Sequence, residues 1–331
     1  MNLRTTYLGF KLRTPLVVSA SPLSDSVDNV RRMEEAGASA IVLFSLFEEQ
    51  IRSERYELHW STTQGTESYP EALSYFPEPN ELSVGPEAYL KHIANVKKTV
   101  SIPVIGSLNG VAVSGWTDFA RQIQDAGADA LELNLYSVPT DTNLTGAEIE
   151  KQYVEIVQAV RAEVSIPLAV KVSPFFTNFA NMARRFADAG ANGLVLFNRF
   201  YQPDIELESL DVSPNVFYST PMAMRLPMRW IAILHEKVGC SLAASSGVHR
   251  GTDALKMLMA GADVTMLCSV LMRHGIDHIR SIEKEMLTWM LEHDFKSVEQ
   301  LKGNLSHRNC PDPTAFERAQ YMRAIGVQNI R

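Results

Sequence analysis

The sequence predicts a (β/α)8 barrel, the TIM-barrel fold, on two observations. Eight short apolar runs alternate with amphipathic helical patterns, and four of the eight runs open in the same way. Alternating strands and helices give an open doubly wound sheet or a closed barrel, and eight units favour the barrel. The predicted strands lie near 15–21, 38–45, 102–109, 130–136, 167–173, 193–198, 241–247 and 264–269. The predicted helices lie near 26–36, 86–99, 116–126, 146–163, 178–188, 222–237, 252–260 and 275–292.

The four similar strands each follow a helix end and the tripeptide Ala-Gly-Ala. The glycines of these tripeptides fit the left-handed position just past a helix C-terminus. The apolar run after each tripeptide is nearly continuous, which is typical of a strand with both faces buried. The four glycines are Gly37, Gly127, Gly190 and Gly261. Two further strands begin at Ile-Pro, where proline is tolerated because the first residue of a strand need not donate to the ladder.

Composition indicates one domain and limits the classes of function. The chain has 331 residues, of which 46% are hydrophobic, and a net charge of −7. We therefore expect a single domain over 1–331, with 293–331 as a helical tail packed outside the barrel. The negative charge argues against nucleic acid as a partner. The three scattered cysteines show no metal-site spacing, and no apolar run is long enough to cross a bilayer, so we expect a cytoplasmic protein with no metal and no membrane partner.

Small and polar residues occupy the predicted strand ends, which in a barrel converge on the active site. Asparagine amides can read the edge of a flat heteroaromatic ring. Small residues before a helix N-terminus, after the last two strands, are typical of a phosphate site. The residues alone thus predict a flat, phosphorylated cofactor. The candidate binding residues are Ala20, Ser21, Ser45, Asn109, Asn134, Lys171, Asn198, Ser246, Gly247, Cys268 and Ser269.

Each candidate also has a purely structural interpretation. Lys171 could pair with Glu132, because a buried charge without a partner is costly. The asparagines could cap turns, and the Ser246-Gly247 pair could form an ordinary tight turn. Cys268 could be a small buried hydrophobic residue. The long segments 46–84 and 199–221 follow strands, so we expect them to rise from the face that carries the active site.

Several of these stretches resemble the dihydroorotate dehydrogenase family of FMN-dependent barrels. They are PLVVSAS, LELNL, AVKVSP, LFN, SSGVHRGTDAL and VTMLCSVL, and the resemblance spans roughly residues 3 to 290. It implies that FMN is the cofactor, with Ala20 and Ser21 against the flavin and Asn109 and Asn134 beside its ring. It also implies that Lys171 lies at the N1/O2 edge of the ring, where a cation stabilises the reduced flavin. Ser246, Gly247, Cys268 and Ser269 then occupy the phosphate-binding positions.

The same resemblance implies a catalytic base in the loop after the fourth strand. The family pattern is Asn-Leu-Ser-Cys-Pro-Asn or a version with serine at the fourth position, and this chain has Asn134-Leu-Tyr-Ser-Val-Pro139. Ser137 therefore falls on the base that takes a proton from the substrate while a hydride leaves for the flavin. A serine needs a relay to act as a base, and Tyr136 is one candidate for it. A turn-stabilising hydroxyl is the alternative role for Ser137.

The chain departs from the family pattern where the substrate binds. Phe44 aligns with a lysine that touches flavin and substrate, Val138-Pro139 replaces Pro-Asn, and residues 74–85 keep only the outline of the substrate loop. Arg199 could supply a new contact to an anion. The expected substrate is dihydroorotate or a related molecule with a CH–CH bond to oxidise. Because the sequence opens close to the first predicted strand, we do not expect the N-terminal hydrophobic helix of the membrane-linked enzymes.

The electron acceptor is open and includes a possible electron-transfer partner subunit, and family analogy suggests a homodimer. Two alternatives to an FMN oxidoreductase remain. One is a phosphate-binding isomerase or aldolase in which Lys171 forms a Schiff base. The other is a barrel that binds FMN without turnover.

Overall fold

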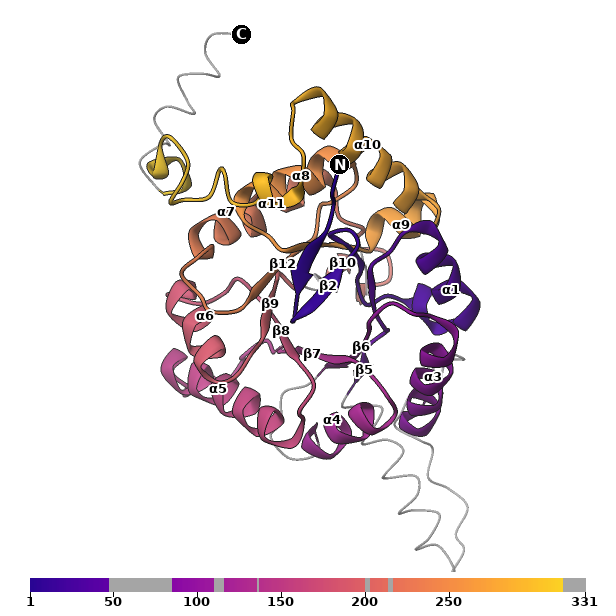
Figure 1. Ribbon diagram of the computed structural model, residues 1–331. Helices are drawn as coiled ribbons and strands as arrows, with labels where there is room; N and C mark the ends of the chain where they lie inside the picture. Colours follow the sequence, from indigo (N-terminus) through magenta and orange to yellow (C-terminus); the bar gives the residue numbers. More distant parts are fainter. Residues whose placement is uncertain (48–84, 110–115, 136, 200–202, 214–216, 318–331) are drawn as a thin grey trace, which may run out of the picture.

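Parallel strands close into a barrel with the helices around its outside (Figure 1). This computed structural model describes the whole chain except residues 48–84, 110–115, 136, 200–202, 214–216 and 318–331. The nine-stranded sheet consists of eight barrel strands and the short β5 (Leu46–Phe47), and the pairings β13–β3 and β4–β6 complete the ring. The predicted barrel is confirmed. Its strands are β3 (Leu16–Val18), β4 (Ala40–Val42), β6 (Val104–Asn109), β7 (Ala130–Asn134), β8 (Leu168–Val172), β9 (Gly193–Leu196), β12 (Ser241–Ser245) and β13 (Val264–Leu267).

The helices follow the predicted order, with one addition after the last strand. The main helices are α1 (Val27–Ala36), α3 (Pro86–Thr99), α4 (Trp116–Asp125), α5 (Gly146–Glu163), α6 (Phe179–Asp188), α7 (Arg225–Leu234), α8 (Gly251–Ala260) and α10 (His278–Glu292). The 3-10 turns η1 (Pro22–Asp25) and η2 (Pro221–Met224) precede α1 and α7. The addition is the short α9 (Ser269–His274), where the sequence predicted only a loop before the helix at 275–292.

Two apolar layers hold the barrel together. The larger layer lies between the strands and the helices and contains the outward-facing residues of each strand. The smaller layer fills the barrel with side chains such as Val17, Ile105, Ala130 and Val195. This alternation explains why the strands read as continuous apolar runs, since both of their faces are buried.

The repeated Ala-Gly-Ala segments do more than end helices. The glycines have φ of 111°, 99°, 102° and 120°, as the left-handed position requires. The next residue, Ser39, Asp129, Asn192 or Asp263, donates its backbone N–H to the preceding barrel strand. Its side chain then accepts a backbone N–H at the start of that same strand. These accepting bonds are Thr14 N to Ser39 Oγ (2.8 Å), Val104 N to Asp129 Oδ2 (2.7 Å), Leu168 N to Asn192 Oδ1 (2.9 Å) and Leu242 N to Asp263 Oδ2 (2.7 Å).

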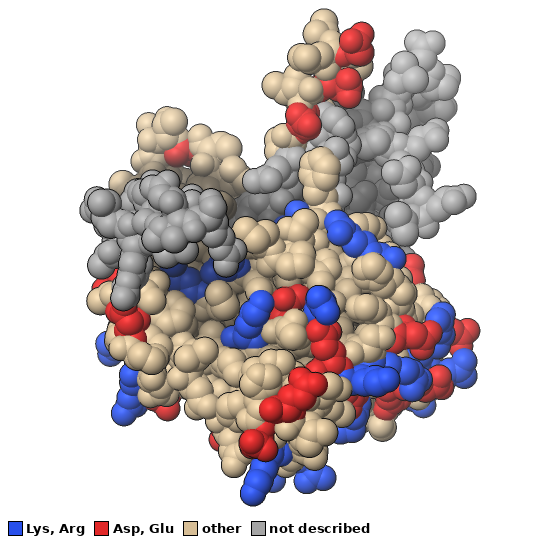
Figure 2. Space-filling view, turned by 90° about the horizontal axis from the view of Figure 1, so that it is seen from above, with Lys and Arg blue, Asp and Glu red and all other residues tan. Residues whose placement is uncertain are grey.

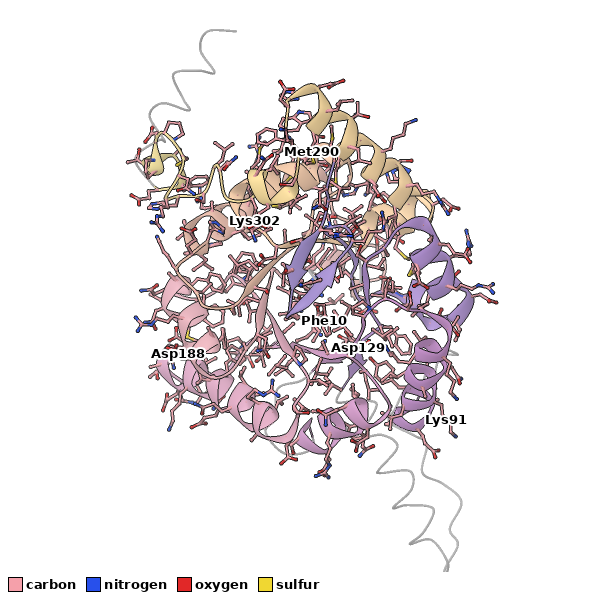
Figure 3. The ribbon with its side chains drawn as sticks, in the orientation of Figure 1. Phe10, Lys91, Asp129, Asp188, Met290 and Lys302 are labelled. Atoms are coloured by element: carbon pink, nitrogen blue, oxygen red, sulfur yellow. The ribbon has the colours of Figure 1, made fainter. Side chains whose placement is uncertain are left out.

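A two-stranded hairpin, β1 (Thr5–Tyr7) and β2 (Phe10–Leu12), covers the N-terminal end of the barrel. Its two-residue turn has positive φ at Leu8 (51°) and Gly9 (85°), the pattern of a type I′ turn. Leu8 enters the barrel end, where a Cβ on Gly193 would lie 2.7 Å from its Cδ2 atom. Phe10, labelled in Figure 3, lies over the same end. The hairpin therefore seals this end, and ligands have access from the other.

The segment after β9 forms a second hairpin, β10 (Asp204–Glu206) and β11 (Asp211–Ser213), which projects from the body of the molecule (Figure 2). Ile205 and Leu210 on this hairpin are 68% and 86% exposed. On the face seen in Figure 2, acidic and basic side chains are interspersed over the helices.

The described part of the tail contains α11 (Val298–Leu301) and η3 (Pro313–Phe316). Lys302, labelled in Figure 3, pairs with Asp263 at 3.1 Å and so ties this tail to the barrel. Among the helices of the described residues, none has both the length and the apolar character needed to cross a membrane.

Candidate functional site

A hollow of about 540 Å³, partly open to solvent, lies at the carboxyl ends of the strands and is called here the β12–β13 hollow. Seven of the eleven candidate cofactor residues line it, namely Ala20, Lys171, Asn198, Ser246, Gly247, Cys268 and Ser269. The lining also includes Ser19, Arg199, Ser219, Ser245, Val248 and Met266.

One end of this hollow is a tight turn at Ser246 and Gly247, which have φ of 79° and 80°. A Cβ on Gly247 would lie 2.4 Å from the backbone nitrogen of Met224, so no larger residue fits without movement. Opposite the turn, α9 begins at Ser269. A phosphate site formed by the loops after strands seven and eight and by a short extra helix is characteristic of barrels.

Ser219 joins the three segments at this end and was not predicted. Its backbone N–H donates to Ser269 Oγ (3.0 Å), and its own hydroxyl accepts the Gly247 N–H (3.4 Å). The same hydroxyl lies 3.2 Å from Nε2 of His249, a buried imidazole. Burial and the nearby Arg273 lower the pKa of His249. His249 stands inside the SSGVHRG stretch, but Ser219 lies far from it in sequence, and no local pattern marks it.

The wall of the hollow carries a lysine whose partner was one of the predicted alternatives. Lys171 Nζ lies 3.2 Å from Glu132 Oε1, and the two side chains are 9% and 0% exposed. Lys171 also lines the hollow, so the lysine that pairs with Glu132 is at the same time part of the wall of the hollow. Cys268 lies nearby, and burial raises the pKa of its thiol, an effect that the charges of Lys171 and Arg199 oppose.

Asn134 belongs to a separate polar cluster inside the barrel mouth. Its Nδ2 donates to Ser107 Oγ (2.9 Å) and to the Leu108 carbonyl (3.1 Å), and Ser45 Oγ lies 2.8 Å from Ser107 Oγ. Asn109 lies two residues beyond Ser107 on β6, so its side chain faces the same side of the sheet, and it pairs in register with Asn134. These residues do not line the β12–β13 hollow, although Asn134 pairs in register with Lys171 across β7 and β8. The cluster therefore adjoins the hollow through the lysine.

Ser21 lies directly after the hollow's Ala20 and is also outside the lining. Its hydroxyl oxygen is buried and has no hydrogen-bond partner among the described residues. A buried hydroxyl without a partner costs free energy, so its position is compatible with a ligand that supplies the missing bond.

Ser137 lies in a different hollow, of about 600 Å³, between the loop after β7 and helix α5. Tyr153 lines this Ser137 hollow as well. Burial raises the pKa of the Tyr153 phenol, and hydrogen bonding with Ser137 opposes that shift. The structure thus does not bring Ser137 together with Lys171, and Tyr136, the predicted relay, is outside the described residues. Among the described residues, the phenol that hydrogen-bonds with Ser137 is that of Tyr153, which sequence reasoning missed because it comes from a helix.

Phe44 does not occupy the inward position at the end of the second barrel strand. Its ring packs on Tyr89 and His92 of α3, with centroid distances of 5.0 and 5.6 Å. The side chain that faces the barrel is the next one, Ser45, which is uncharged. Whether Phe44 or Ser45 is aligned with the family's lysine, the end of this strand therefore supplies no cation to the site. Residues 74–84 of the aligned substrate loop are outside the described residues.

No group of three or more His, Cys, Asp and Glu side chains that could hold a metal occurs in the part of the chain that the structure describes.

Comparison with known proteins gives a consistent set of matches. A protein-family model described as dihydroorotate dehydrogenase matches residues 82–290. The catalytic subunit of dihydroorotate dehydrogenase B (NAD(+)) from Thermoplasma volcanium is 26% identical over 91% of this chain and 98% of the relative. The protein of the same name from Methanothermobacter thermautotrophicus is 24% identical, over 92% and 98%. The chloroplastic dihydropyrimidine dehydrogenase (NADP(+)) of Arabidopsis thaliana is 22% identical, over 92% of this chain and 76% of the relative.

Proposed function

The chain belongs to the dihydroorotate dehydrogenase family and is a flavin oxidoreductase that acts on CH–CH bonds, and on that premise we propose that its flavin is FMN, bound in the β12–β13 hollow. The observation that carries the proposal is the chemistry of the lining. Ser246, Gly247 and Ser269 form a compact polar end suited to a phosphate, and the ammonium of Lys171 lies at the wall. Ser21 lies outside the lining but directly after Ala20, and its buried hydroxyl, which lacks a partner among the described residues, is a candidate donor if the wall of the hollow adjusts to the cofactor.

Each part of the site has a separate task in this proposal. When bound, FMN would supply the acceptor for the hydride that the substrate loses. Ser269 and the turn at Ser246 and Gly247 would hold the phosphate, and Lys171 would provide positive charge beside the ring. Asn134 offers its amide oxygen as a hydrogen-bond acceptor to the ligand, since its Nδ2 already donates to Ser107 and to the Leu108 carbonyl.

Ser137 is the proposed base, with Tyr153 as the group that orients it. A serine hydroxyl is a weak base alone, and a hydrogen-bonded phenol is one partner that can relay the proton. Because Ser137 lies in its own hollow beside Tyr153, its side chain would have to turn toward the barrel axis to reach a substrate at the β12–β13 hollow. This rearrangement is part of the proposal, which rests here on the loop position after β7 and on the family resemblance.

The proposed substrate is dihydroorotate, or a related dihydropyrimidine. The second candidate follows from the relative that is named for dihydropyrimidine, a ring without the carboxylate of dihydroorotate. Relatives named as catalytic subunits support an electron-transfer partner subunit, and we also propose that the protein forms a homodimer. The ion pair of Lys171 with Glu132 argues against the Schiff-base alternative, because an ammonium held in an ion pair is not a nucleophile.

The test is an absorbance spectrum of the purified protein followed by anaerobic addition of dihydroorotate or dihydrouracil. Loss of the oxidised flavin absorbance within seconds supports substrate oxidation, and the added compound that causes this loss is the substrate. We expect Ser137→Ala to bind flavin normally and to lose the bleaching, while Ser209→Ala on the exposed β10–β11 hairpin retains it. A protein that takes up no flavin even after FMN is added contradicts the proposal.

A further inference from the structure

Glu132 is a buried carboxylate in the barrel interior that neither packing nor the proposed chemistry explains. It is 0% exposed, and its strand neighbours in register are Ser107 and Ala169. Oε1 meets Lys171, but Oε2 is buried with no hydrogen-bond partner among the described residues. The smaller apolar layer of the barrel interior contains side chains such as Ala169 and Val195, together with Tyr7, which carries a hydroxyl. A carboxylate with one hydrogen-bonded oxygen thus stands in a largely apolar interior.

Stability alone does not account for this carboxylate. Removing two charges from water is costly, and apolar replacements of a buried ion pair are often neutral or stabilising. Here the cost is raised further because one oxygen lacks a hydrogen bond. The partner lysine, however, lines the β12–β13 hollow. The pair therefore connects the barrel interior with the ligand site.

The negative charge of Glu132 acts over a wide part of the interior. Tyr7, whose hydroxyl is also buried without a partner among the described residues, has its pKa raised well above the ordinary value by burial and then by the charge of Glu132. The pKa of Tyr89, on the other side of the strands, is raised mainly by burial and also by Glu132. Charges inside a protein are weakly screened, so a ring bound beside Lys171 is within reach of the same field.

We propose that Glu132 is a positioning residue that holds the Lys171 ammonium at the wall of the hollow and, by compensating its charge, lowers the reduction potential of the bound flavin. This inference rests on the proposed function. Lys171 lies on the ligand side of the pair and favours the reduced ring, which carries more negative charge. Glu132 lies behind it and opposes that effect. Glu132 thereby fixes the distance of the lysine nitrogen from the ring and weakens the stabilisation of the reduced ring by the lysine charge.

The experiment measures the midpoint potential of the flavin by equilibration with reference dyes under anaerobic conditions. Glu132→Gln keeps an oxygen for the lysine and removes the charge, so we expect a more positive potential. Lys171→Gln removes the cation, so we expect a more negative one. Tyr7→Phe is the matched control in the same interior, because it changes a buried polar group without changing charge, and its potential stays at the wild-type value.

A second measurement separates the ring from the phosphate. Affinities of the apoprotein for FMN and for riboflavin, which lacks the phosphate, are expected to change by the same factor in Glu132→Gln. In Ser269→Ala only the FMN affinity falls. If Glu132→Gln does not fold, the double variant Glu132→Leu with Lys171→Met replaces it, and its negative shift is expected to be smaller than that of Lys171→Gln.

The inference is overturned if Glu132→Gln has the wild-type potential, or if the double variant shifts as far as Lys171→Gln. Either result would leave Glu132 with a structural role alone. Failure of the proposed function is distinguishable from both, because a wild-type protein that binds no flavin has no potential to measure.

Discussion

Gly247 packs closely against Met224 in the proposed phosphate site, and replacing it with alanine is a sharp test of that geometry. The new Cβ would lie 2.4 Å from the Met224 nitrogen and 2.8 and 2.9 Å from its Cβ and Cα atoms. Two of these atoms are backbone, so a rotamer change cannot relieve the contact. The residue also has φ of 80°, which a side chain disfavours.

The magnitude follows from these two effects. A left-handed conformation costs a residue with a Cβ about 1–2 kcal/mol. Overpacking a well-filled site costs about 1–3 kcal/mol more. Together they predict that Gly247→Ala lowers the free energy of unfolding by about 2–5 kcal/mol, less whatever the turn recovers by moving away from Met224. That movement would widen the turn, so the affinity for FMN falls as well.

The assay is chemical denaturation followed by circular dichroism, together with FMN titration by flavin fluorescence. Gly239→Ala is the matched control, since a Cβ there meets nothing within 4 Å. We expect the control to unfold and to bind FMN like the wild type. If Gly247→Ala also behaves like the wild type in both measurements, the close approach of the turn to Met224 is refuted, and with it the assigned shape of the phosphate site.

Four further predictions concern other parts of the molecule. Asp263→Ala removes the acceptor for the Leu242 N–H at the start of β12 and the ion pair with Lys302, so we expect the unfolding free energy to fall by about 2–4 kcal/mol. For the exposed Asp188→Ala we expect a fall of about 0.5 kcal/mol or less. Arg199→Gln should weaken orotate binding by about 10-fold or more and leave uracil, which lacks the carboxylate, unchanged; equal losses for both would exclude a carboxylate contact. Burial raises the pKa of the Cys240 thiol to about 12 from an ordinary value of 9.0, so the contribution of the neutral thiol to stability is complete below pH 9 and is lost as pH rises through 12. Between these limits, Cys240→Ala should reduce the fall of the unfolding free energy with pH by about 1.4 kcal/mol per pH unit. An unchanged slope would contradict this. Leu210→Asp on the projecting hairpin should convert a dimer to monomer in sedimentation if the apolar side of that hairpin forms the proposed interface, whereas an unchanged sedimentation coefficient would place the interface elsewhere.

The barrel could be predicted because its signals are local. The Ala-Gly-Ala segments, the apolar runs and the helical patterns each depend on a few neighbouring residues, and the structure has strands and helices in all those places. The elements that sequence reasoning missed are short. Strands of three residues, such as β1 and β2, contain too little alternation to be recognised. The six-residue α9 merges with the end of the last apolar run.

The candidate site was predictable in composition but only partly in geometry. The residues after β12 and β13 lie together because parallel strand ends must converge, and that rule needs no knowledge of side-chain direction. Side-chain direction is less predictable elsewhere. Phe44 turns outward because its ring packs on Tyr89 and His92 of α3, whereas Ser137 hydrogen-bonds with Tyr153 of α5. Ser219 was missed because its three partners are distant in sequence.

The order in which the barrel closes has a consequence for synthesis of the chain. β3 at Leu16–Val18 pairs with β13 at Val264–Leu267, and the Thr5 hydroxyl donates to the Asp263 carbonyl. The N-terminal hairpin thus has no completed barrel end to enter until β13 has been synthesised. At ribosomal rates of about 5–20 residues per second, β1, β2 and the free edge of β3 wait roughly 10–50 s for their partners. During that interval Tyr7, Leu8 and an unpaired strand edge are accessible to chaperones and to other nascent chains.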